Sequence, residues 1–80
     1  MVTKQMIIDK FNCSEVKQID SKQLFIITKD NEQFLVSYFT IVGKVIGGRW
    51  HVTTEKYSVT TTRQLSYFAR THSVIWTDTI

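Results

Sequence analysis

Three residues in the C-terminal third of the chain have the types and the spacing of a binding surface. Arg63, Tyr67 and Arg70 recur at positions i, i+4 and i+7, so a helix would place them on one face. A guanidinium group can bind a carboxylate or a phosphate through paired hydrogen bonds, and a tyrosine ring adds rigid contact area. This spacing predicts a contact surface for an acidic protein patch or a nucleic-acid backbone. Lys56 and Arg49 are expected to extend it across a sheet edge.

The helix that carries this stripe is predicted over residues 61–72. Its opposite face has apolar positions at i, i+3, i+4 and i+7, which would pack on a sheet. These positions are Leu65, Phe68, Ala69 and His72. Thr60 or Thr61 is expected to cap the first turn, and Gln64 would complete a capping box. The alternative interpretation of the basic stripe is a solvated face whose arginine stems cover apolar groups.

Nucleophilic and metal-binding side chains are few and far apart in the sequence. Cys13, His51 and His72 lack the paired spacing of metal-binding loops, and nothing orients a cysteine–histidine pair for catalysis. No glycine-rich phosphate loop is present. A chain of 80 residues also has little room for a pocket, since small-molecule sites use roughly 300 Å³ or more. We therefore expect no enzyme, no metal and no cofactor.

The aromatic residues have two interpretations. Single-strand nucleic-acid binders stack bases on exposed rings beside basic grooves, and Trp50 and Trp76 could serve in that way. However, tryptophan usually anchors a small core, so we expect both side chains in the core or at its rim. Four further aromatic residues are expected in the core: Phe25, Phe34, Tyr38 and Phe39.

Composition favours a small sheet-rich domain. Valine, isoleucine and threonine supply 28 of the 80 residues, and these branched side chains suit a pleated surface better than a helix. The length allows one domain, residues 1–80. The formal net charge is +3, and the whole excess lies in residues 33–80. This balance is compatible with an anionic partner without requiring one.

Targeting signals are not apparent in the sequence. Lys4 and Asp9 stand where a signal peptide would be apolar. No apolar run approaches the roughly 20 residues that a membrane helix needs. Cys13 is the only cysteine, which fits a reducing compartment. We expect a cytoplasmic protein, inside a host cell, that makes no membrane contact.

Hydrophobic periodicity and turn residues predict the remaining elements. A short helix is expected over Thr3–Phe11 with Thr3 as its cap. Hairpin turns are expected at 29–32 and at Gly47-Gly48. Strands are predicted over residues 16–19, 24–28, 34–46, 49–54 and 73–76, with a bulge or bend at Gly43 in the long third strand. The predicted fold is α+β: one antiparallel sheet of four to five strands, one main helix on one face and the short N-terminal helix.

Two segments resemble small uncharacterised phage proteins. Those proteins share a Tyr-Ser-x-Thr-Thr core, followed by a basic residue and often a histidine, and then a phenylalanine four residues further on. A preceding strand carries an aromatic residue and a Ser-Tyr-x-Thr-like segment. The matching residues here are Tyr57-Ser58-Val59-Thr60-Thr61, Arg63, Phe68 and Ser37-Tyr38-Phe39-Thr40, within residues 35–70. Gln64 stands where the histidine is expected, which puts any role of that histidine in doubt here. The resemblance implies an origin in a phage or mobile element and no biochemical activity.

We therefore expect a small non-enzymatic protein that covers the acidic surface of a host or defence protein. An inhibitor of a nucleic-acid-handling complex, such as an anti-CRISPR protein, would suit the size and the implied origin. The first alternative is direct nucleic-acid binding by the same basic and aromatic helix face. The second alternative is a homodimer that forms through an exposed edge strand, either residues 16–19 or residues 73–76.

Overall fold

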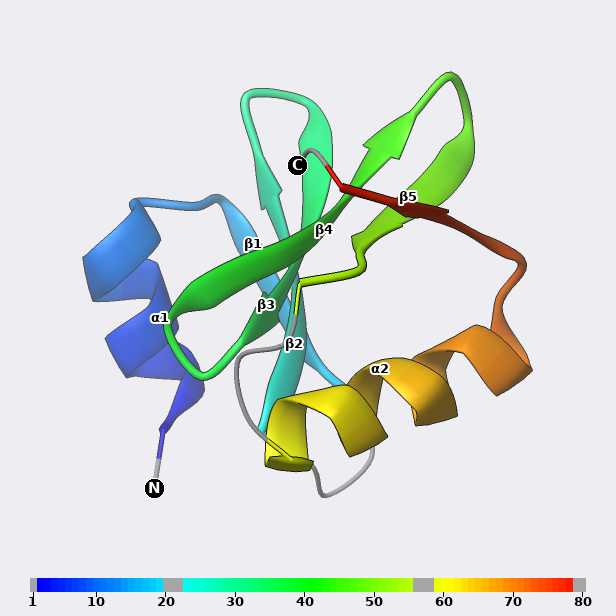
Figure 1. Cartoon of the computed structure of the whole chain (residues 1–80). Coiled ribbons are helices and arrows are strands. Elements are labelled where there is room, and N and C mark those ends of the chain that lie inside the picture. Colours follow the sequence, from blue (N-terminus) through cyan, green and yellow to red (C-terminus); the bar gives the residue numbers. More distant parts are fainter. Residues whose placement is uncertain (1, 20–22, 56–58, 79–80) are drawn as a thin grey trace.

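The computed structural model describes residues 2–19, 23–55 and 59–78 (Figure 1). The described residues form two helices and one six-stranded sheet. The helices are α1 (Lys4–Phe11) and α2 (Val59–Thr71), and the strands are β1 (Glu15–Gln18), β2 (Leu24–Lys29), β3 (Glu32–Ser37), β4 (Thr40–Ile46), β5 (Arg49–Thr53) and β6 (Val74–Thr77). The strands lie side by side in chain order. Neighbours from β1 to β5 are antiparallel, and β5 and β6 are parallel.

The expected antiparallel sheet of four to five strands is therefore wrong in strand number. The predicted strand over residues 34–46 is two strands, β3 and β4, joined by a tight turn at Tyr38 and Phe39. Tyr38 adopts a φ of 56°, which is uncommon for a residue with a side chain. Because neither residue is a usual turn former, the sequence carries no turn signal at this point.

The expected sheet is also wrong in its pairing. From β5 the chain crosses one sheet face as α2 and returns as β6, so β6 runs in the same direction as β5. Beyond the two strands, the Thr54 hydroxyl donates a hydrogen bond to Asp78 Oδ1 at 2.8 Å. The mixed sheet is the consequence of placing a helix between two neighbouring strands.

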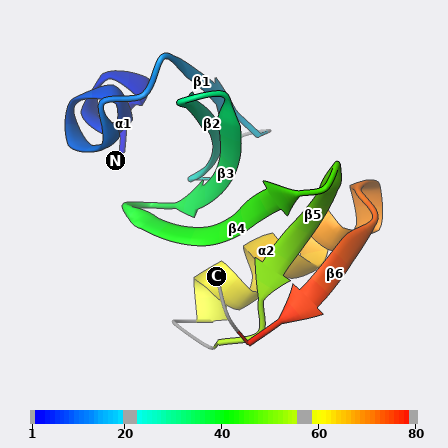
Figure 2. The same cartoon turned by 90° about the horizontal axis from the view of Figure 1, so that it is seen from above.

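The two helices cover opposite faces of the sheet (Figure 2). On the α1 face, Ile7 packs with buried residues of β2 and β3 such as Phe25 and Val36. On the α2 face, the buried residues are Leu24, Leu35, Val42, Val52, Leu65 and Phe68. Strands β2, β3 and β4 contribute to both clusters because successive side chains point to opposite faces. The prediction of one covered face is thus corrected to two small cores.

A bulge in β4 lies directly beside the predicted position, Gly43. Leu35 pairs with Gly43 and Val36 pairs with Ile41, so Val42 is the extra residue. A Cβ atom at Gly43 would lie 3.0 Å from Leu35 Cβ and 3.2 Å from the His51 carbonyl oxygen. Glycine is therefore required here by the close approach of neighbouring strands.

Local signals elsewhere are confirmed. The Thr3 hydroxyl accepts a hydrogen bond from the Met6 N–H at 3.2 Å and caps α1. Asn12 ends that helix with a φ of 53°. The expected hairpin turns also form, with positive φ at Asp30 and Asn31 in one and at Gly47 and Gly48 in the other. The remaining expected turn, residues 20–22, lies outside the described residues.

Candidate functional site

The residues of α2 divide between a buried face and an outward face. Thr61, Gln64, Leu65 and Phe68 are buried against the sheet. Arg63 and Arg70 are exposed, and Tyr67 between them is partly buried. Seven residues of helix separate the two arginines by about 10 Å along the axis. The structure thus places the predicted stripe on the solvent side of a helix that the sheet holds in position.

The two arginines of this stripe have no acidic partner among the described residues. The ion pair found in that part of the chain joins Lys44 Nζ to Glu32 Oε1 at 3.4 Å, between strands β3 and β4. Within residues 2–19, 23–55 and 59–78, no carboxylate therefore pairs with the positive charges that Arg63 and Arg70 present to the solvent. Both guanidinium groups keep their full donor capacity for an external carboxylate or phosphate.

Of the other two predicted contact residues, Arg49 does not join the stripe. Arg49 is exposed at the first position of β5, and its neighbour Trp50 packs on the α2 face. Because side chains alternate along a strand, Arg49 projects from the sheet face opposite to α2. Lys56 lies outside the described residues. The structure therefore brings together three of the five predicted residues.

The start of α2 differs from the predicted cap. The helix begins at Val59, so Thr60 and Thr61 lie inside its first turn. Thr61 Oγ1 lies 3.1 Å from Ser37 Oγ, and the Ser37 hydroxyl donates a hydrogen bond to Gln64 Oε1 at 2.5 Å. The predicted capping box is therefore wrong. These polar side chains instead meet inside the interface between α2 and β3, where their mutual hydrogen bonds satisfy them.

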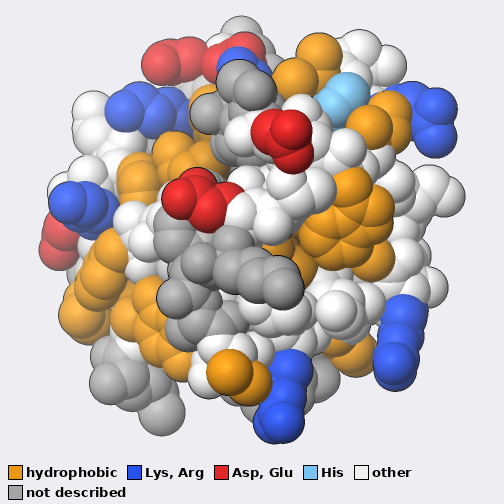
Figure 3. All heavy atoms as spheres, viewed as in Figure 1, with side chains coloured by type: hydrophobic (Ala, Val, Ile, Leu, Met, Phe, Trp, Pro, Cys, Tyr) orange, Lys and Arg blue, Asp and Glu red, His pale blue; other side chains and the backbone are white. Residues whose placement is uncertain are grey.

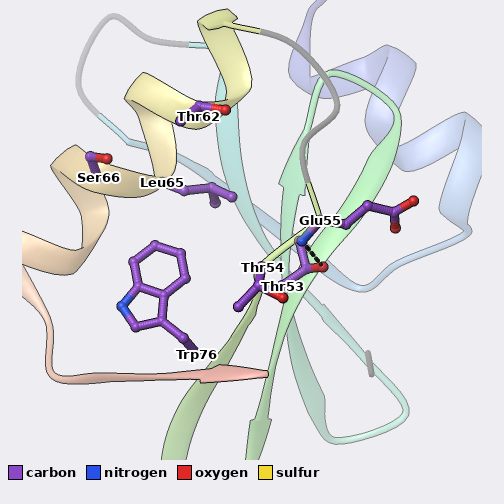
Figure 4. A pocket seen from close by; sticks show the side chains of 7 residues that line it. All are labelled: Thr53, Thr54, Glu55, Thr62, Leu65, Ser66 and Trp76. Atoms are coloured by element: carbon purple, nitrogen blue, oxygen red, sulfur yellow. Dashed lines mark hydrogen bonds between the residues drawn. The ribbon is translucent and has the colours of Figure 1, made fainter. Parts of the chain in front are cut away.

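A shallow pocket opens between α2 and the ends of β5 and β6 (Figure 4). Its volume is about 170 Å³, below the roughly 300–1,000 Å³ of small-molecule sites. Leu65 and the ring of Trp76 face one another across it, while the Glu55 carboxylate points away. Hydroxyl groups complete the lining: Thr53, Thr54, Thr62 and Ser66. Such a pocket can seat one small side chain but holds no converging set of titratable groups.

The two tryptophans lie in different environments. Trp50 packs edge-on against Phe68 with the ring centroids 5.3 Å apart, as expected of a residue at the core rim. Trp76 is 48% exposed and belongs to neither core cluster, so its predicted place in the core or at the core rim is wrong. Tyr38 and Phe39 are also exposed, at 40% and 39%, because they form the turn between β3 and β4. No sequence signal separated these exposed rings from the buried ones.

The sheet separates Cys13 from His72, two of the residues considered for catalysis or metal binding. Cys13 is buried on the α1 face, whereas His72 stacks on Phe68 on the α2 face with the ring centroids 4.2 Å apart. In the described part of the chain, no group of three or more histidine, cysteine or acidic residues is placed to hold a metal ion. Neither described helix is long and apolar enough to cross a membrane.

Comparison with known proteins adds one relationship. The family described as "Family of unknown function (DUF8033)" matches residues 6–75. The chain belongs to the DUF8033 family. No curated protein and no solved structure matches this DUF8033 protein. The matched range contains the exposed stripe of α2 and most of the sheet.

Two segments of this DUF8033 protein that sequence analysis singled out separately meet in space. Ser37 is the last residue of β3, directly before the turn to β4, and Thr61 and Gln64 lie in the first turns of α2. The hydrogen bonds between them give both segments a structural role. Sequence reasoning missed this contact, since it interpreted Thr61 and Gln64 as parts of a local cap. The signal available was the polar Ser37 at the end of an otherwise apolar run, Phe34–Val36.

Proposed function

We propose that this DUF8033 protein is a non-enzymatic binding protein that covers an acidic surface of a partner protein through α2. The observation that supports the proposal is the outward stripe of Arg63, Tyr67 and Arg70. Its guanidinium groups are exposed and have no acidic partner among the described residues. Tyrosine and arginine are the residue types that most often dominate the energy of protein interfaces. The resemblance to phage proteins makes a host or defence protein the partner class to test first.

The stripe is preorganised for such a contact. Phe68 and Leu65 anchor the inner side of α2 in the core, and Ser37 binds the first turns of the helix through Thr61 and Gln64. A binding face on an ordered helix loses little backbone freedom when a partner docks. The two arginine side chains then provide the specificity, because each can bind a carboxylate through paired hydrogen bonds.

The distribution of charge favours a protein partner over nucleic acid. On the face seen in Figure 3, lysine and arginine side chains lie apart around the margin, with hydrophobic and acidic side chains between them. Proteins that track a phosphate backbone usually line a continuous basic groove. Two arginines would neutralise about two phosphates, which supports only weak, strongly salt-dependent binding.

Capture of partners from host lysate, with and without nuclease, tests the proposal. We expect the wild-type protein to retain a discrete acidic protein after nuclease treatment. The double variant Arg63→Glu/Arg70→Glu should lose at least about 90% of this capture, because charge reversal opposes the acidic surface.

Arg49→Glu is the control, since it reverses one arginine charge on the opposite sheet face, where the double variant reverses two on α2. It should leave capture unchanged, and circular dichroism should show all variants folded. Loss of the partner on nuclease digestion would instead support nucleic-acid binding. Equal losses in the double variant and the control would contradict a role for α2.

A further inference from the structure

The two edges of the sheet differ in their protection against further pairing. Strand β1 is one edge and carries charged residues at Glu15 and Lys17. Strand β6 is the other edge, and its residues, Val74–Thr77, include no charge and no proline. Natural sheets usually protect their edges with such residues, because an unprotected edge pairs with another strand. Strand β6 is thus the edge with fewer protective side chains.

The hydrogen-bonding pattern shows which backbone groups β6 offers. The Thr54 N–H donates to the Thr77 carbonyl oxygen at 2.9 Å. In a parallel pair, residues alternate between bonding the neighbouring strand and pointing away from it. Ile75 and Thr77 therefore turn their backbone groups toward β5. Val74 and Trp76 turn their N–H and C=O groups outward, where a second strand can bind them.

The surroundings of β6 leave this outer side open. Helix α2 lies beneath the sheet and not beside β6, and no described strand runs along the outer side (Figure 2). Val74 packs on the α2 face, Trp76 lines the pocket on that same face, and Ile75 projects from the other face. Trp76 remains 48% exposed, a large apolar surface beside an open strand edge.

We propose that β6 pairs antiparallel with β6 of a second copy of this chain, with Ile75 on the two-fold axis. In this register, Val74 lies opposite Trp76 of the second copy, so the outward backbone groups of both strands meet and exchange hydrogen bonds. Each tryptophan packs beside a valine on the α2 face, and the two Ile75 side chains meet on the other face.

This register makes the strand complementary to itself, so a second copy satisfies the outward backbone groups of both Val74 and Trp76. A one-residue shift would place outward backbone groups opposite inward ones and break the bonding. The two-fold axis is perpendicular to the sheet, so both copies of α2 lie on the same side of a continuous sheet. The pairing follows from the edge alone and does not depend on the proposed function of α2.

Sedimentation velocity across roughly micromolar to millimolar protein, together with amide hydrogen exchange by NMR, tests the pairing. We expect a concentration-dependent dimer. Exchange of the Val74 and Trp76 amides should slow at least about tenfold as the dimer forms. The Ile75 and Thr77 amides, already bonded to β5, should change little. A monomer at every concentration, or a dimer in which these amides keep their exchange rates, would overturn the proposal.

Charge substitutions at the axis give a second test. Ile75→Lys places two lysines opposite each other and should weaken dimerisation about tenfold or more. Ile46→Lys is the matched control, since Ile46 is 50% exposed at the β4–β5 hairpin, away from the β6 edge. It should leave the dimer unchanged. Mixing Ile75→Lys with Ile75→Glu should restore association as a heterodimer, and failure to do so would contradict the register.

Discussion

At the scale of single residues, the polar contacts of Ser37 determine how α2 meets the sheet. Ser37, Thr61 and Gln64 are 2%, 5% and 4% exposed, so water cannot replace their hydrogen bonds. A buried polar group that loses its partner costs more than the bond itself contributed. The three side chains therefore specify one position of the helix, because a shifted helix would leave them unpaired.

Replacing Ser37 tests this role. Ser37→Ala removes the hydroxyl that contacts both Thr61 and Gln64 and should lower the free energy of unfolding by about 1–3 kcal/mol. Urea denaturation followed by circular dichroism measures the change. Ser66→Ala removes an exposed hydroxyl from α2 and should change stability by less than about 0.5 kcal/mol.

The double variant Ser37→Ala/Gln64→Met separates bonding from packing. It removes both partners of the Ser37–Gln64 hydrogen bond, so it should be more stable than Ser37→Ala alone. Additive losses in the two substitutions would mean that the contribution of Ser37 is packing and not hydrogen bonding.

At the scale of elements, the turn between β3 and β4 is unlike the other two described hairpin turns. Those turns use Asp30-Asn31 and Gly47-Gly48, which adopt positive φ readily. The β3–β4 turn has a tyrosine at a φ of 56° followed by an exposed phenylalanine. A non-glycine residue in this conformation stores strain of about 1–3 kcal/mol. The turn is tolerated because the paired strands on both sides fix it.

Relieving this strain should stabilise the protein. Tyr38→Gly removes the steric conflict and should raise the free energy of unfolding by about 0.5–1 kcal/mol, after the entropy cost of glycine is subtracted. Phe39→Gly is the matched control. Phe39 has no positive φ to relieve, so this variant should be destabilised by about 0.5–1 kcal/mol. Thermal unfolding measures both, and two changes of the same sign would contradict a strained Tyr38.

At the scale of the whole molecule, two small cores share one sheet. The α1 core and the α2 core lie on opposite faces, and β2, β3 and β4 supply residues to both. Neither core can lose its strands without exposing the other. We therefore expect the described domain to unfold in one cooperative transition.

A substitution in one core should be detected from the other. Ile7→Ala empties part of the α1 core and should lower the free energy of unfolding by about 2–4 kcal/mol. Trp50 lies in the α2 core against Phe68, and the second tryptophan, Trp76, lies on the same sheet face. Tryptophan fluorescence should therefore report the same midpoint shift as far-ultraviolet circular dichroism. Ile46→Ala removes the same atoms from an exposed site and should have little effect. A fluorescence midpoint that stays unchanged in Ile7→Ala would show that the halves unfold separately.

Much of the local structure could be predicted from residue types alone. The cap at Thr3 and the turns at Asp30-Asn31 and Gly47-Gly48 depend on the conformations of a few adjacent residues. The helical stripe of Arg63, Tyr67 and Arg70 depends only on the helix period. Such features need no knowledge of what packs against them.

Only the tertiary structure decided the rest. The burial of Thr61 and Gln64 depends on a serine more than 20 residues away in the sequence, so their local pattern resembled a helix cap. The direction of β6 depends on how α2 crosses the sheet, and the exposure of Trp76 depends on β6 being an edge. The side of the sheet from which Arg49 projects likewise depends on which face α2 covers. Residue types alone indicated both helices and most strands, because their signals are local, but they did not show that residues 34–46 divide into β3 and β4. Packing determined which surfaces remain open for binding, because burial depends on residues distant in the chain.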